Sequence, residues 1–113
     1  MTTAAFIIHV PGDRRRERNV RRLRSYLIDA GVTDVHVFDG VVPDDAGPLR
    51  TLGEWGCYRS HVGALRAGLA IGTDEVMVLE DDAVPVLTPG ELATFLAAAR
   101  PEAWDSCTSD IRR

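Results

Sequence analysis

Three consecutive acidic residues, Glu80, Asp81 and Asp82, are the part of this sequence best suited to binding a metal ion. They follow an apolar run, residues 76–79, that is typical of a parallel strand buried on both faces. In parallel α/β sheets, ligands collect beyond the carboxyl ends of the strands. Two carboxylates ~6 Å apart repel by roughly 3 kcal/mol at an effective dielectric constant of about 20, so a cation nearby would offset a substantial cost.

The spacing of these acids indicates which of them could share an ion. While the chain is extended, Glu80 and Asp82 point to one side and Asp81 to the other. Glu80 and Asp82 could therefore hold one Mg²⁺ or Mn²⁺ ion, which prefers oxygen ligands and leaves room for phosphate oxygens. The alternative is a solvated acidic turn in which Asp81 or Asp82 caps local backbone, and the residues alone leave both interpretations open.

A second candidate is the start of the first predicted helix, which carries Arg14, Arg15, Arg16 and Arg18. Acidic side chains are favoured at a helix N-terminus, and phosphate groups bind there readily. Arg14 to Arg16 are therefore candidates for holding an anion. The alternative is an exposed basic face on an otherwise acidic protein.

The third candidate is the segment GEWGCYRSH, residues 53–61. Cys57 and His61 are four residues apart and share one face of the predicted helix. Two residues do not make a zinc site, and no other Cys–His pair accompanies them. We expect Cys57 to fill the core and His61 to be a hydrogen-bonded histidine in the core or beside a site.

The pattern of apolar runs and turn residues predicts three strands alternating with three helices. The strands are 4–10, 35–38 and 76–79, the last of them central. The helices begin after Asp13, Thr51 and Thr88 and end near Gly31, Gly72 and Pro101, with residues 41–50 as a loop. Their inward residues are expected to be Val20, Leu23, Leu27 and Ile28; Tyr58, Val62, Leu65 and Leu69; and Leu92, Phe95, Leu96 and Ala99. This order predicts one α/β domain over residues 1–113, a mostly parallel sheet with helices on both faces.

Composition narrows the possible functions. The chain has 113 residues, a net charge of −4 and no lysine, and it carries seven arginines between residues 14 and 24. An acidic protein with one short basic stretch does not predict a nucleic-acid partner. No run approaches the ~20 apolar residues of a membrane span, and the N-terminus lacks the pattern of a signal peptide. We therefore expect a cytoplasmic protein whose two cysteines are reduced.

Taken together, several motifs resemble glycosyltransferase family 25, which includes bacterial lipopolysaccharide-biosynthesis transferases and collagen galactosyltransferases. They are a strand ending in Pro11 before closely spaced arginines, FDG at 38–40, GEWGCYRSHVGAL at 53–65 and VMVLEDDAVP at 76–85. The combination of GxxGCxxSH with a later LEDD is the most specific part, and the likeness runs from about Phe6 to Asp105. One departure is His9, which stands where the family usually has asparagine in its first strand.

The resemblance implies a GT-A-like fold that binds a UDP-hexose such as UDP-galactose and transfers the sugar to a glycan or another hydroxyl acceptor. LEDD is similar to the family's metal motif, which implies Mn²⁺ or Mg²⁺ at Glu80 and Asp82. The residues expected at the nucleotide sugar are Pro11, Arg14, Asp39, Gly40, Ser60, His61 and Asp81.

Family members are longer, and the part beyond Trp104-Asp105 would be expected to complete the sheet and bind the acceptor. Without that part, a homodimer covering the exposed sheet edge is expected.

The alternative function is a non-catalytic module that binds a nucleotide or a partner. A phosphorelay receiver domain is rejected, because the chain has no lysine and no acidic residues directly after its first strand.

Overall fold

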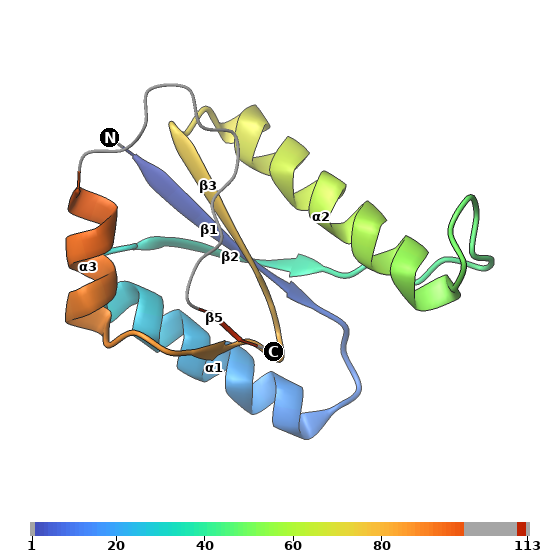
Figure 1. The fold of residues 1–113 in the computed structure, drawn as a ribbon, viewed down its shortest axis with the longest axis horizontal. Helices are drawn as coiled ribbons and strands as arrows, with labels where there is room; N and C mark the ends of the chain where they lie inside the picture. Colours follow the sequence, from blue (N-terminus) through green and yellow to red (C-terminus); the bar gives the residue numbers. More distant parts are fainter. Residues whose placement is uncertain (1, 99–110, 113) are drawn as a thin grey trace.

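The computed structural model describes residues 2–98 and 111–112 (Figure 1). Its elements are β1 (Thr3–His9), α1 (Arg14–Asp29), β2 (Asp34–Asp39), α2 (Leu52–Ile71), β3 (Glu75–Glu80), β4 (Val84–Pro85), α3 (Pro89–Ala97) and β5 (Ile111–Arg112). The three predicted strands and three predicted helices are confirmed, and β4 and β5, which pair antiparallel with each other, were not predicted. The third helix ends at Ala97, not at Pro101, because Ala98 leaves the helical conformation with a ψ of 154°.

The main sheet has the strand order β2-β1-β3, and both pairings are parallel. The prediction that β3 is the central strand is wrong. Strand β1 pairs with a neighbour on each side, and its five middle residues are buried, whereas most residues of β3 are half-buried. The strand order reverses across β1, so a crevice is expected beyond the carboxyl ends of β1 and β3.

Helices cover both faces of the sheet (Figure 1). Helices α1 and α3 pack on one face, where Ile7 of β1 meets Leu23 and Leu27 of α1 and Leu92 of α3. Helix α2 lies on the opposite face, where its residue Ala64 joins a second cluster of buried side chains. The α/β class and the two covered faces are therefore confirmed. None of the helices within the described residues is long and apolar enough to cross a membrane.

The face that α2 turns towards the sheet is not the predicted one. The expected inward residues Tyr58, Leu65 and Leu69 are exposed, and Val62 is only half-buried. The buried residues of α2 are instead the small ones, which recur every four positions: Gly56, Ser60, Ala64 and Gly68. Small side chains let the backbone of α2 lie close to the sheet. The helix therefore packs against the sheet through glycine, alanine and serine, and its large apolar side chains are not buried there.

The homodimer expected from the sequence stays a prediction.

The amino ends of β1 and β3 are joined by Asp74. Its Oδ2 accepts hydrogen bonds from the backbone N–H of Thr2, at 2.7 Å, and from the Thr2 hydroxyl, at 3.0 Å. These two bonds hold the pKa of the Asp74 carboxyl below its ordinary value of 3.8.

We predict that this link makes part of the stability depend on pH. A carboxyl whose pKa is lowered by folding stabilises the protein above its unfolded pKa, and that contribution is lost as the pH falls through the folded pKa. In thermal unfolding, wild type should therefore melt above Asp74→Asn at about pH 7, and the difference should shrink towards about pH 3. A difference that stays constant over this range would contradict the assignment.

Candidate functional site

A cavity of about 410 Å³ lies beyond the carboxyl ends of the parallel strands. Its wall comes from the end of β1, the loop after β2, the first turns of α2 and the end of β3, with Arg16 of α1 added from the other face of the sheet. This is the position at which the strand order reverses, and ligands of open α/β sheets bind at such positions. The geometry therefore identifies this cavity as the candidate site.

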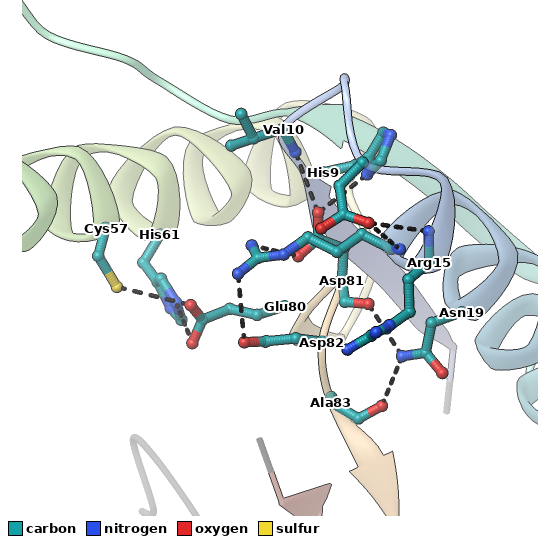
Figure 2. A network of polar contacts seen from close by, with 12 residues as sticks. His9, Val10, Arg15, Asn19, Cys57, His61, Glu80, Asp81, Asp82 and Ala83 are labelled. Atoms are coloured by element: carbon teal, nitrogen blue, oxygen red, sulfur yellow. Dashed lines mark hydrogen bonds and ion pairs between the residues drawn. The ribbon is translucent and has the colours of Figure 1, made fainter.

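Asp81 organises the polar side of the cavity (Figure 2). Its side chain is only 4% exposed. Oδ2 accepts hydrogen bonds from Nδ1 of His9, at 2.9 Å, and from the backbone N–H of Val10, at 3.2 Å, while Oδ1 accepts one from Nη1 of Arg16, at 3.1 Å. Because a carboxylate only accepts hydrogen bonds, Nδ1 of His9 carries the proton. Both oxygens of Asp81 therefore have partners within the protein, which ties β1, β3 and α1 together.

The turn after β3 is fixed by Asn19 of α1. Nδ2 of Asn19 donates to the carbonyl oxygen of Asp81, at 2.9 Å, and to that of Ala83, at 2.8 Å (Figure 2). Backbone carbonyls next to a buried turn need partners, and here one amide group supplies them for two residues. The conformation of the acidic turn is thus set by a helix more than sixty residues away in sequence.

The start of α1 places Arg16 beside the acidic turn. The Asp13 carboxylate caps the helix by accepting from the backbone N–H groups of Arg15 and Arg16, and these bonds lower its pKa. From this first turn Arg16 reaches Asp81, and its Nη2 also lies 3.8 Å from Oδ2 of Asp82. The repulsion among the three acids is therefore partly offset by the chain's own groups, and repulsion alone does not require a metal ion.

The Glu80 side chain turns towards Cys57 and His61 of α2, away from His9 and Val10 (Figure 2). Its Oε1 lies 3.9 Å from Sγ of Cys57, and its Oε2 lies 3.9 Å from Nε2 of His61. Cys57 and His61 are one helical turn apart on α2, and all three side chains line the cavity. The prediction that Cys57 fills the core is wrong, whereas His61 does lie beside the site, as one of its two expected positions. Cys57 is half-buried in the cavity wall, and Nε2 of His61 has no hydrogen-bond partner among the described residues.

Close backbone contacts hold α2 and the loop after β2 together at the cavity. The Ser60 hydroxyl donates to the carbonyl oxygen of Gly56, at 2.7 Å, and accepts from the backbone N–H of Val41, at 2.8 Å. A Cβ on Gly56 would lie 2.8 Å from the Val41 carbonyl oxygen, so glycine is required there. Ser60, predicted at the nucleotide sugar, therefore lines the cavity but uses its hydroxyl to fix the loop.

The residues predicted from the sequence divide into two groups. Those that line the cavity are Ser60, His61, Glu80 and Asp81, whereas Pro11, Arg14, Asp39, Gly40 and Asp82 are not among its lining residues. Of the second group, Pro11, Arg14 and Asp39 are exposed.

Gly40 has a backbone role at the end of β2. Its N–H donates to the carbonyl oxygen of His9, at 2.9 Å, and a Cβ at this position would lie 2.7 Å from a methyl group of Val10. The glycine thus lets the chain leave β2 close to β1.

Two residues of the site, His9 and Asn19, were not among the predicted site residues. His9 departs from the family pattern at the end of a strand, and that departure was the one signal that could have pointed to it. Asn19 stands one residue before Val20 in an arginine-rich helix, and nothing local distinguishes it from a solvent-facing side chain.

The acids present can be tested against the Mg²⁺ or Mn²⁺ ion that the resemblance implies. Oδ1 of Asp82 is buried and has no hydrogen-bond partner within the described part of the chain, although the side chain as a whole is 39% exposed. A buried carboxylate oxygen without a partner is costly, and a cation is one way to satisfy it. Glu80 and Asp82 extend in the same direction in Figure 2. Asp82 and Glu80 can therefore each supply an oxygen ligand of the kind that a hard divalent cation prefers.

Comparisons of the chain with protein-family models, with curated proteins and with solved structures find no match.

Proposed function

We propose that this chain is the nucleotide-sugar-binding part of a metal-assisted glycosyltransferase, which moves a hexose from a UDP-hexose such as UDP-galactose to a hydroxyl group of a glycan or another acceptor. One observation carries the proposal. The two sequence segments that resemble family 25, GEWGCYRSH and LEDD, come together on one cavity beyond the carboxyl ends of a parallel sheet. They are separated by more than fifteen residues in sequence, and the fold brings both to the position where α/β sheets bind ligands.

The proposed roles follow from the position of each side chain. Glu80 and Asp82 would hold Mn²⁺ or Mg²⁺, which neutralises charge on the diphosphate of the leaving nucleotide. Arg16 lines the cavity and is 44% exposed, so its guanidinium can bind phosphate oxygens while it keeps its bond to Asp81. The apolar residues Val41 and Pro43 provide a surface for the nucleoside.

Binding of UDP in the presence of Mn²⁺, measured by isothermal titration calorimetry, tests the proposal directly. We expect Mn²⁺ to increase the affinity for UDP, and we expect Asp82→Asn to remove most of that increase, a loss of at least ~10-fold, because it deletes one ligand charge. The matched control is Asp29→Asn, which removes the same charge at the far end of α1 and should leave the increase intact.

An equal increase in wild type and Asp82→Asn would contradict the role of Asp82, and no UDP binding at all would contradict the nucleotide site. Release of UDP from UDP-galactose with a glycan acceptor then distinguishes a transferase from a non-catalytic module. Binding of UDP with Mn²⁺ but without turnover would support the non-catalytic module instead.

A further inference from the structure

Three donor atoms of different chemistry meet where α2 passes the end of β3. They are Sγ of Cys57, Nε2 of His61 and a carboxylate oxygen of Glu80, and all lie within 4.8 Å of one another. Within residues 2–98 no other group of three such side chains comes as close. Asp81 takes its own hydrogen bonds from His9, Val10 and Arg16, none of which belongs to this group of three (Figure 2).

The fold holds this cluster in position before any ligand arrives. Cys57 and His61 are four residues apart on α2, a spacing that places both on one helix face. The same helical turns contact the loop after β2, because Gly56 packs against the Val41 backbone and the Ser60 hydroxyl accepts a hydrogen bond from the Val41 N–H. Glu80 is the last residue of β3, and β3 is hydrogen-bonded to the central strand β1.

The separations between the donor atoms suit a single ion. With zinc bonds of about 2.3 Å to sulfur and about 2.0–2.1 Å to nitrogen or oxygen, tetrahedral geometry puts neighbouring ligand atoms ~3.3–3.7 Å apart. The contacts of Cys57 and His61 to Glu80 are both 3.9 Å, each to a different carboxylate oxygen, and one donor atom from each residue lies within 4.8 Å of the other two. Binding one ion would therefore require the side chains to rotate and draw together.

We propose that Cys57, His61 and Glu80 form a three-ligand site for a zinc-type divalent cation. Thiolate and imidazole select borderline ions such as Zn²⁺ and Co²⁺ over Mg²⁺, which takes oxygen ligands. The buried Nε2 of His61, which has no hydrogen-bond partner among the described residues, is the nitrogen that would bind the ion. All three residues line the cavity, so the fourth coordination position faces a space that can hold water or a phosphate oxygen.

This site does not depend on the proposed transferase activity, although both involve Glu80. A zinc-type ion at Cys57 and a hard cation at Asp82 would need the same carboxylate. The two ions are therefore expected to compete, and each can be measured without the other.

Titration of the full chain with Co²⁺, in the absence of any nucleotide, tests the site. We expect a thiolate-to-cobalt charge-transfer band, with the intense visible bands of a four-coordinate ion, and both should disappear when Zn²⁺ is added. Cys57→Ser should abolish the charge-transfer band and weaken cobalt binding by at least ~100-fold, because even groups outside the coordination sphere cost ~10–100-fold. Cys107→Ser removes the other cysteine and should retain the band, as should Asp82→Asn.

The absence of a charge-transfer band at saturating Co²⁺, or a band that survives Cys57→Ser, would overturn the proposal. If Cys57→Ser does not fold, X-ray absorption on the zinc-loaded wild type decides instead. One sulfur ligand at about 2.3 Å supports the site, and no sulfur or two sulfurs contradicts it. A cobalt band in a protein that does not bind UDP would refute only the nucleotide proposal, and UDP–Mn²⁺ binding without a cobalt band would refute only this one.

Discussion

Asp81→Ala is expected to lower the free energy of unfolding by about 3 kcal/mol, one of the two largest effects on stability that we predict for a single substitution. Removing one member of a buried ion pair costs ~3–5 kcal/mol, because its partner is left without compensation. The lower end of this range applies to Asp81, because its partner Arg16 is 44% exposed and water partly screens the ion pair between them. His9 is only 13% exposed and would lose its acceptor, as would the backbone N–H of Val10.

Thermal denaturation measures this effect conveniently. For a domain of about 100 residues, each 1 kcal/mol shifts the melting temperature by ~4–8 °C, so the variant should melt ~12–24 °C below wild type. The matched control is Asp82→Ala, which removes the adjacent carboxylate. Asp82 is 39% exposed and lies 3.8 Å from Arg16, and its loss should cost at most ~1 kcal/mol. Equal losses in the two variants would refute the structural role assigned to Asp81.

Gly68→Ala should be the second large effect on stability, a net loss of up to about 2 kcal/mol in the free energy of unfolding, even though alanine is the better helix former. A Cβ at this position would lie 2.3 Å from Cγ2 of Val76, 3.0 Å from its Cγ1 and 3.2 Å from its Cβ. Rotating a β-branched side chain cannot clear all three contacts, so α2 must move away from β3. Overpacking of this kind costs ~1–3 kcal/mol, against a gain of ~1 kcal/mol in helix propensity.

Gly90→Ala in α3 provides the control for helix propensity, because a Cβ there meets only the Thr88 hydroxyl at 4.0 Å. It should be neutral or slightly stabilising in chemical denaturation. The double variant Gly68→Ala/Val76→Ala should lose less stability than the sum of the two single variants, since each substitution relieves the consequence of the other. If the losses of the two single variants simply add in the double variant, the clash between Gly68→Ala and Val76 is not the cause of the destabilisation.

The positions of the helices and strands could be predicted because their signals are local. Asp13, Thr51 and Thr88 cap the three helices as expected, and Gly72 takes the left-handed conformation that ends α2. A cap needs only a few neighbouring residues, so the sequence contains all the information that determines it. Strand order is different. The apolar run of β3 was interpreted as central, but which strand lies in the middle depends on pairing across the whole chain.

The buried face of α2 could not be found from hydrophobic periodicity. That method gives weight to large apolar side chains, and those of Leu65 and Leu69 follow a helical spacing while lying exposed. The contact with the sheet is made by glycine, alanine and serine, whose contribution comes from the close approach that they permit. A stripe of small residues at four-residue intervals was the signal available in the sequence.

The sequence could place the acidic turn at the end of a strand, but it could not predict the partners of its three side chains. A strand end predicts that acids will lie at a site, and Glu80 and Asp81 do line the cavity. The partner of each acid depends on side chains such as His9 and Arg16, which are 72 and 65 residues from Asp81 in sequence. The alternation of side chains along an extended strand therefore could not predict that Asp81 forms a buried ion pair or that Glu80 lies beside Cys57.

The hydrogen bonds of Asn19 to the carbonyls of Asp81 and Ala83 constrain how the length of this protein can vary. Inserting or deleting one residue between Asp13 and Asn19 would rotate the amide about 100° around the helix and leave both carbonyls without their donor. The distance from cap to amide is therefore fixed, whereas the loop of residues 42–50, which has no helix or strand, can gain or lose residues at little cost. Natural length variation should avoid the first turns of α1 and accumulate in that loop.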